Sequence, residues 1–311
     1  MAQDYDVTIK KLVKNFPQDY VRLVFKNAAA KIELLNVELP ATKHYTNVLV
    51  KVTVANETFI FHLEFFSSYE KDAPARMYGY AARIASQYPE LGIYGVVLYL
   101  NEEDRDKPFP NFYEKWILGE RRSYHKFDVI KIWELAADDV LRQQIIGLLP
   151  VVALMQHEKE STEQVIRAAI DQMQQKVEDA GLRAEMFAAL YLFSGLKQLR
   201  ALITKLLKEA NMLELLEKSE TYQEILTKGW EKGREEGESK SFIRSILVIL
   251  RARFGDASEE LSKQLQGLAA SQLDDLVAKA MTIESLAVFE ALIHNLKAQP
   301  ENGSARHGQN L

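Results

Sequence analysis

The chain has 311 residues, of which 47% are hydrophobic and 27% charged, and it contains no cysteine. This composition is typical of a globular protein of about two domains with apolar side chains enough for a sizeable core, and the missing cysteines exclude disulfides, thiolate zinc sites and cysteine nucleophiles. The 39 lysines and arginines against 44 aspartates and glutamates give a net charge of −5, which excludes a strongly basic nucleic-acid-binding protein but not a local basic groove.

No segment is typical of a targeting or membrane sequence. The first residues contain neither a basic stretch nor an apolar core like that of a secretory signal. The longest apolar runs, around residues 93–100 and 145–155, are shorter than the roughly 18 residues that a membrane-spanning helix needs. We therefore expect a cytoplasmic protein without a membrane partner.

Residues 1–150 have a mixed α/β pattern. Apolar residues at helical spacing predict a helix over Asp6–Phe25, which Pro17 breaks or kinks. Residues 46–54 are rich in β-branched side chains and predict a strand, and residues 58–66 predict a second one. A turn at residues 55–57 would join the two strands into a hairpin in which Val54 lies opposite Thr58 and Asn47 opposite Phe65.

A helix and two more strands follow this hairpin. Asp72 and Pro74 are typical of a helix start, and Pro89 ends the helix. The apolar run of residues 93–100 predicts a strand covered on both faces, and residues 129–135 predict another strand. The order strand, strand, helix, strand predicts a mixed sheet flanked by helices.

The C-terminal half has an all-α pattern from residue 138 to residue 296. We expect helices over about 138–158, 161–179, 183–193, 196–208, 212–218 and 220–254, with two short helices after residue 255. We divide this half into a helical extension (151–228), a charged glycine-repeat segment (229–245), a small helical domain (246–296) and a disordered tail (297–311). The apolar stripes of these helices, such as the one within residues 196–207, predict a homodimer through the C-terminal helices.

Three glycines recur every four residues in the charged segment. Gly229, Gly233 and Gly237 would share one face of a helix, where a second helix can approach closely, although each glycine costs a helix about 1 kcal/mol. The charged residues between them exclude the membrane form of this motif. The segment is therefore either a helix-pairing surface or a flexible charged linker.

Glu64 is the acidic residue that most needs an explanation. The two-residue period of a strand puts Ile60, His62, Glu64 and Phe66 on one face, and Phe65 on the other. A carboxylate in such an apolar strand is unfavourable unless it is paired, hydrogen-bonded or bound to a metal. Its partner would be Arg76 or Lys51 if its role is structural.

Seven short motifs, in this order, resemble a known bacterial family. They are Asp6-x-x-x-Lys10, Leu35-Asn36-Val37-Glu38-Leu39, His62-Leu63-Glu64-Phe65, Arg76-Met77-x-x-Tyr80-x-x-Arg83, Val129-Ile130-Lys131-Ile132-Trp133-Glu134, Tyr222-Gln223-Glu224-Ile225-Leu226 and Leu250-Arg251-x-Arg253-Phe254-Gly255. The chain resembles the recombination-promoting nucleases or putative transposases of the PD-(D/E)XK nuclease superfamily, and its last part is similar to a helical domain of unknown function that is often appended to them.

The resemblance implies a nuclease-like α/β core in residues 1–150 that acts on DNA with Mg²⁺. In that family an Asp on the first hairpin strand and a Glu on the second bind the metal, and a Lys or Gln two residues later orients the attacking water. Glu64 matches the metal-binding glutamate, whereas Asn47 replaces the Asp and Phe66 replaces the Lys or Gln. Asp6 and Glu38 are the acids that can substitute if they reach the pocket.

The resemblance leaves two hypotheses open. One is a Mg²⁺-dependent DNA nuclease that is weak or has a rewired metal site, with Glu64 as the metal ligand. The other is a non-catalytic protein that uses the same fold to bind DNA or to interact with proteins. Asn47 and Phe66 distinguish the two hypotheses and favour the second on chemical grounds.

Basic residues are candidates for phosphate binding under either hypothesis. Lys10 lies on the first predicted helix, and Arg76 and Arg83 lie two helical turns apart on one side of another. Both arginines are equally suited to structural pairing with Glu64 or Asp72. A further cluster, Arg121, Arg122, His125 and Lys126, is either a phosphate contact or a solvated surface.

Overall fold

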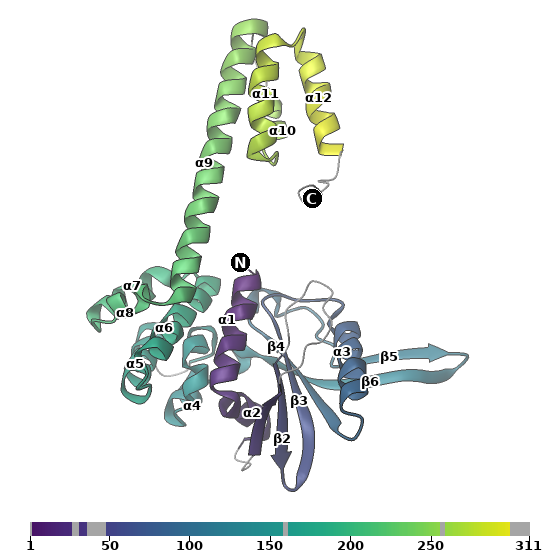
Figure 1. Cartoon of the computed structure of the whole chain (residues 1–311), viewed down its shortest axis with the longest axis vertical. Helices are drawn as coiled ribbons and strands as arrows, with labels where there is room; N and C mark the ends of the chain where they lie inside the picture. The colour runs from purple at the N-terminus through teal and green to yellow at the C-terminus, as the bar shows by residue number, and fades with distance from the viewer. Residues whose placement is uncertain (1, 27–30, 36–47, 158–160, 256–258, 299–311) are drawn as a thin grey trace, which may run out of the picture. The chain divides into compact units, whose positions relative to one another are not determined.

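The computed structural model describes residues 2–26, 31–35, 48–157, 161–255 and 259–298 (Figure 1). The chain divides into two compact units, residues 1–223 and residues 224–311. Asn47 and Glu38, two predicted site residues, lie outside the described residues. The predicted domain boundaries at residues 150, 228, 245 and 296 stay predictions.

The first unit contains a six-stranded mixed sheet. Its strands are β1 (Lys31–Leu35), β2 (Val48–Val54), β3 (Glu57–Phe66), β4 (Gly92–Tyr99), β5 (Phe112–Ile117) and β6 (Glu120–Lys131). They lie in the order β1-β2-β3-β4-β6-β5. The pairs β3–β4 and β4–β6 are parallel, and the other neighbouring pairs are antiparallel. The predicted mixed sheet is therefore confirmed.

The β2–β3 hairpin forms where it was predicted, but its register differs by one residue. Val54 pairs with Glu57 rather than Thr58. The turn contains only Ala55 and Asn56, and both have positive φ, at 50° and 67°. Two such residues make the tight turn whose twist matches the twist of the strands, so the hairpin closes one residue earlier than predicted.

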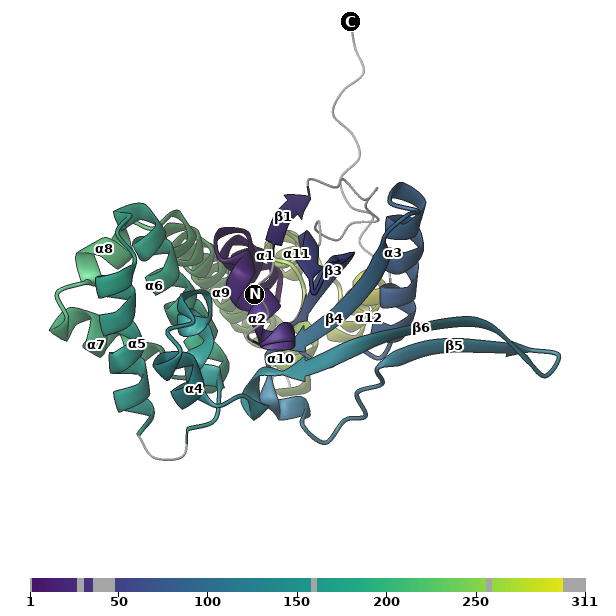
Figure 2. The same cartoon turned by 90° about the horizontal axis from the view of Figure 1, so that it is seen from below.

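Helices cover both faces of the sheet (Figures 1 and 2). The predicted N-terminal helix is two helices, α1 (Ala2–Asn15) and α2 (Pro17–Phe25), which divide at Pro17 as expected. α2 packs on one face, where Phe25 contacts Phe59 and Phe61 of β3. α3 (Ala73–Gln87) crosses the other face between β3 and β4, and its Ile84 packs with Ile60.

Three sequence-based expectations in this unit were wrong. β1 and β5 were not predicted as strands. The strand predicted at residues 129–135 overlaps β6 only at residues 129–131, because β6 begins at Glu120 and Ile132–Glu134 is a 3₁₀ turn. β5 and the first part of β6 are largely exposed, so they lack the alternation of apolar and polar residues that marks a half-buried strand. The predicted helix over 138–158 is α4 (Ala137–Arg142) and the 3₁₀ segment η3 (Ile146–Leu154), because Pro150 prevents α-helical hydrogen bonding.

The rest of the first unit is helical. Two more 3₁₀ turns, η1 and η4, span Glu102–Asp104 and Gly195–Lys197. The helices are α5 (Thr162–Lys176), α6 (Ala180–Ser194), α7 (Arg200–Glu209) and α8 (Leu213–Glu217). α6 is buried along most of its length, and it packs against η3, which is almost wholly buried.

The second unit is all-α, as predicted. α9 (Glu220–Phe254) begins in the first unit and continues into the second, followed by α10 (Glu259–Leu265), α11 (Ala270–Thr282) and α12 (Leu286–Ala298). In residues 259–298, the described part of the chain after residue 255, there are thus three helices where two were expected. Their core joins Leu250 of α9 to Leu261, Leu276 and Phe289.

The glycine-repeat segment is helical throughout. Residues 229–245 lie within α9. No atom of the described residues lies within 4 Å of a Cβ built on Gly229, Gly233 or Gly237, apart from the helix's own neighbouring backbone. The glycine face is therefore open in the described part of the chain, and pairing of this face, like the homodimer, stays a prediction. None of the described helices is long and apolar enough to cross a membrane.

We predict that the sheet core depends on the middle strand β3. Leu63→Ala removes a side chain that is 1% exposed, and a buried leucine truncated in this way typically costs about 2–5 kcal/mol of unfolding free energy. Leu118→Ala, at a side chain that is 93% exposed, is the matched control and should cost almost nothing. Urea unfolding can be followed by tryptophan fluorescence in a Trp230→Phe background, where Trp116 and Trp133 both report on the first unit. Equal midpoints for the two variants would contradict the prediction.

Candidate functional site

β3 places Glu64 inside the first unit. The strand lies between β2 and β4, and its even-numbered residues face α3: His62 contacts Tyr80, and Phe66 lies under Arg76. The odd-numbered residues face α2, as the contact between Phe65 and Tyr20 shows. The predicted alternation is therefore confirmed. Glu64 is only 2% exposed, so its carboxylate has to be stabilised by protein groups rather than by water.

Arg76 is the partner of Glu64. Its Nη2 donates a hydrogen bond to Oε1 of Glu64 at 3.0 Å. α3 begins seven residues after β3 ends, and this short connection brings Arg76, in the first turn of α3, back over the end of β3. Of the two structural partners expected for Glu64, the structure thus brings Arg76 to it. The other, Lys51, pairs with Ile60 in the β2–β3 ladder.

The proton affinity of Glu64 is unusual. Burial raises the pKa of Glu64 to about 7, although the positive charges of Lys10 and Arg76 act to lower it. Desolvation of the charged form therefore outweighs the pairing with two cations. The second carboxylate oxygen, Oε2, is buried and has no hydrogen-bond partner among the described residues. A carboxyl group that titrates near neutral pH in a buried site is a candidate functional group.

His62 lies beside this carboxylate. Its Nε2 is 4.0 Å from Oε2 of Glu64. Burial lowers the pKa of His62 to about 3, so the imidazole is neutral at pH 7 and the contact is not an ion pair there. The strand period placed His62 on the same face as Glu64, and the structure confirms this position, although His62 was not among the predicted site residues.

Asp6 and Lys10 of α1 also belong to the site around Glu64. They lie one turn apart on α1, and Nζ of Lys10 is 2.7 Å from Oδ2 of Asp6. Lys10 is only 7% exposed, and both charges act on Glu64. The structure thus brings together five residues predicted from sequence: Asp6, Lys10, Glu64, Phe66 and Arg76.

Phe66 occupies the position that the resemblance gives to a water-orienting Lys or Gln. Its ring is buried, and it packs against Tyr99 with 5.4 Å between ring centroids. The guanidinium carbon of Arg76 lies 4.7 Å from the Phe66 ring centroid, so the ring supports the arginine that binds Glu64. Arg83 lies outside this group: it is exposed, and its guanidinium lies over the ring of Tyr80 at 5.6 Å.

The described residues of this site do not fit a Mg²⁺ ion by themselves. Mg²⁺ needs an octahedral set of oxygen ligands, usually from one or two carboxylates together with water and phosphate. Glu64 has one oxygen bound by Arg76, and Asp6 is paired with Lys10. The described residues contain no group of three or more His, Asp or Glu side chains placed to hold a metal. A metal here would depend on Asn47 or Glu38, which lie outside the described residues.

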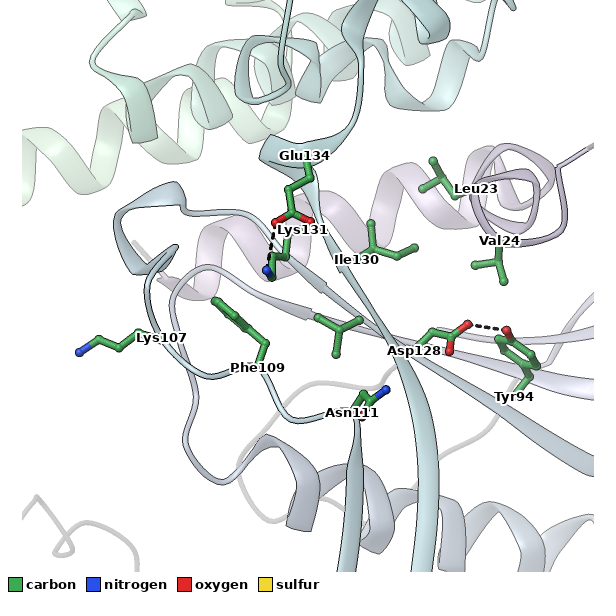
Figure 3. Close-up of a pocket in the computed structure, with 11 residues that line it drawn as sticks. Leu23, Val24, Tyr94, Lys107, Phe109, Asn111, Asp128, Ile130, Lys131 and Glu134 are labelled. Atoms are coloured by element: carbon green, nitrogen blue, oxygen red, sulfur yellow. Dashed lines mark hydrogen bonds and ion pairs between the residues drawn. The ribbon is translucent and has the colours of Figure 1, made fainter.

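A pocket lies on the face of the sheet opposite to Glu64 (Figure 3). Its volume is about 670 Å³, and its walls come from α2, β4, β6 and residues 107–111. The Tyr94 hydroxyl donates a hydrogen bond to Asp128 in its wall, and burial together with this bond raises the pKa of Tyr94 to about 12. Nζ of Lys131 is 3.0 Å from Glu134 and lies over the ring of Phe109. Sequence reasoning did not find this pocket, because its residues come from four separate segments.

We predict that Glu64 makes the protein less stable as the pH rises. Its pKa is 4.5 in a model compound and about 7 in the folded chain, so the folded state binds the proton more tightly. The unfolding free energy should therefore fall by roughly 3 kcal/mol between about pH 4.5 and pH 7, at about 1.4 kcal/mol per pKa unit. In Glu64→Gln this part of the pH dependence should be absent, which urea unfolding at a series of pH values measures.

Glu185 of α6 is a control, because its pKa shift has the opposite sign to that of Glu64. Burial acts to raise the pKa of Glu185, but hydrogen bonds from Thr221 and Ser219 lower it overall. Its contribution to stability is present above the unfolded pKa and is lost as the pH falls. Glu185→Gln should therefore weaken the protein at neutral pH more than at acid pH. The same pH slope in wild type and in Glu64→Gln would contradict the assignment of a raised pKa.

The chain matches no known protein family model, no curated protein and no solved structure. A function for it therefore has to be argued from the geometry around Glu64 and from the ordered motifs of its sequence. Neither a bound molecule nor a relative contributes to that argument.

Proposed function

We propose that this chain is a nuclease-type protein of the recombination-promoting nuclease or putative transposase kind, with a degenerate metal site. It would retain the nuclease-like core and an affinity for DNA, with weak or no cleavage. Support comes first from the order of elements: a β2–β3 hairpin, a helix, and a strand parallel to β3. The glutamate of the motif lies on the second hairpin strand, where the resemblance requires it.

The state of Glu64 carries the proposal. A metal-binding carboxylate needs its oxygens available at a polar, accessible site. Glu64 is 2% exposed, one of its oxygens is bound by Arg76, and burial favours its protonated form. Phe66 then fills the place of the residue that would orient water and holds Arg76 against the carboxylate. These contacts stabilise the fold and compete with a metal for the same oxygens.

The residues around Glu64 still support a role with anions. Arg76 is half-buried and Lys10 is buried, so two cations lie near a carboxyl group that is partly protonated at neutral pH. When Glu64 is protonated, the site carries the charge of Arg76 without compensation from Glu64. Such a site suits a phosphate contact, which positions a nucleic acid without cleaving it.

The alternative is a non-catalytic module that binds DNA or proteins through the same fold. The replacement of two chemically essential residue types, at Asn47 and Phe66, favours this alternative over a fully active nuclease. The two versions of the proposal differ first in whether a metal still binds. A direct measurement of metal binding therefore separates them.

We predict that Mg²⁺ and Mn²⁺ bind weakly or not at all. Calorimetric titration of either ion into the full-length protein should give no more heat than the same titration into Glu64→Ala, because Arg76 binds one Glu64 oxygen and burial favours the protonated form of the carboxyl group. Lys10→Ala is a useful second control, since it changes the charge near Glu64 without removing the carboxylate. Binding to the wild type that disappears in Glu64→Ala would instead show a working metal site and call for cleavage assays.

We further predict that two substitutions restore the metal site. Asn47→Asp returns the second carboxylate and Phe66→Gln returns a polar group able to orient water, so the double variant should bind Mn²⁺ and nick plasmid DNA. Adding Glu64→Ala to the double variant should abolish both activities. A folded double variant that neither binds the ion nor cuts DNA would show that the site has been placed wrongly.

A further inference from the structure

The β5–β6 hairpin forms an arm that extends beyond the sheet. Within the described residues, β6 pairs with β4 only from Phe127 to Lys131, and residues 112–126 pair only with one another. Figures 1 and 2 show the arm projecting past α3 in both views. We call this segment, residues 112–126, the arm.

One face of the arm is anchored at its base. Tyr113 stacks on Tyr78 of α3 with 4.6 Å between ring centroids, and the hydroxyls of Tyr78 and Ser123 are 3.4 Å apart. Nζ of Lys115 lies over the Tyr113 ring at 5.6 Å. This face of the arm therefore packs against α3, and these contacts position the arm relative to the sheet.

The opposite face presents aromatic rings and cations to solvent. Phe112 and Tyr124 lie with 6.2 Å between ring centroids, and the guanidinium of Arg121 lies over the Tyr124 ring at 4.2 Å. Trp116 pairs directly with Arg121, and Lys126 pairs with Phe112. The three rings are 42% (Phe112), 47% (Tyr124) and 59% (Trp116) exposed. We call these five residues the aromatic–cationic face.

The residues at the tip of the arm are not explained by their contribution to folding. Leu118 and Gly119 both have positive φ, at 53° and 78°. Such a turn favours Asn-Gly, and a leucine in this backbone conformation is disfavoured by its own side chain. The Leu118 side chain is also 93% exposed, so it gains nothing from burial. A strained, exposed apolar residue at a projecting tip points to a contact with another molecule.

The arm has a positive net charge, which favours an anionic partner. The arm carries four cations (Lys115, Arg121, Arg122 and Lys126) and two acids (Glu114 and Glu120), which gives +2 in a chain whose net charge is −5. Arg122 is paired with Glu120 at 2.6 Å, and Glu114 lies opposite Tyr124 on the aromatic–cationic face. Arg121 and Lys126 are therefore the cations of this face that can meet phosphates, one near each end of it.

We propose that the aromatic–cationic face binds single-stranded nucleic acid. Unpaired bases would stack on Phe112, Tyr124 and Trp116, while Arg121 and Lys126 contact the phosphates. Bases in a duplex are already stacked on one another, so flat exposed rings favour a single strand. This inference rests on the proposed function in taking a nucleic acid as the partner, but it does not depend on whether the Glu64 site binds metal.

The pocket in Figure 3 lies at the base of the same face. Asn111 of the pocket directly precedes Phe112, and Asp128 is two residues beyond Lys126 on the same side of β6. The pocket also contains Lys131 over the ring of Phe109, the same pairing of cation and ring as on the arm. A strand bound along the arm would thus lead into a pocket with polar groups for the edge of a base.

The test is binding of a labelled oligothymidine of about 20 nucleotides to the full-length chain, measured by fluorescence anisotropy in EDTA. Trp116→Ala and Tyr124→Ala should each weaken binding at least about fivefold, because each removes a stacking ring. Ile117→Ala is the matched control: Ile117 is 57% exposed but lies on the other face of the arm, and its loss should change affinity less than about twofold.

Two neighbouring arginines provide a matched pair of charge variants. Arg121→Gln and Arg122→Gln each remove one positive charge, but only Arg121 belongs to the aromatic–cationic face, whereas Arg122 is paired with Glu120. Arg121→Gln should lower the slope of log K against log salt by about 0.7, the value for one phosphate contact on a single strand. Arg122→Gln should leave the slope unchanged.

Three results would overturn the inference. They are no binding of the oligonucleotide by the wild type at low salt, equal affinity in wild type and in both ring variants, and tighter binding of a duplex of the same length. If these rings bind a protein instead of a nucleic acid, the oligonucleotide does not bind, which is the first of these results. EDTA removes divalent ions, so failure of the arm is distinct from failure of the Glu64 site, which the metal titration tests separately.

Discussion

The structure of the first unit depends on compensating a carboxylate on its middle strand. β3 has a strand on each side and a helix on each face, so a polar side chain on it can be stabilised only by other parts of the protein. Glu64 meets this constraint through Arg76, which α3 supplies because it follows β3 closely in the chain. Removing Arg76 would leave Glu64 buried without its counter-charge, which is more unfavourable than replacing both residues.

The same contacts define what the site can do. Glu64 is bound by Arg76, whose guanidinium lies over the Phe66 ring, and its carboxyl group is partly protonated near neutral pH. Such a group is a poor ligand for a hard cation. Under the proposed function, such a site loses its metal without any change of fold. Phe66 stands where the resemblance implies a water-orienting Lys or Gln, and its ring supports Arg76 beside Glu64. The proposed nuclease-like core would then persist as a binding fold without cleavage.

Much of this arrangement was predictable from the sequence. The periodicities of two and of 3.6 gave the hairpin, α3, the face of Glu64 and the helical second half, because burial imposes those periods. The choice between Arg76 and Lys51 was not predictable, because it depends on where α3 crosses the sheet. The hairpin register was wrong because Ala55 adopts positive φ, which alanine does not signal. The arm was missed because its strands are solvated and carry no burial pattern, and Asn47 and Glu38 lie outside the described residues.

The arm also bears on how the chain avoids aggregation. β5 is an edge strand of the sheet, and its sequence, Phe112-Tyr113-Glu114-Lys115-Trp116-Ile117, has the high β-propensity of segments that add to one another edge to edge. Glu114 and Lys115, in the middle of the strand, are the charged residues that oppose such pairing. The exposed rings of Phe112 and Trp116 lie on this edge strand, so solubility and part of the proposed recognition depend on the same segment. Selection that strengthens one works against the other.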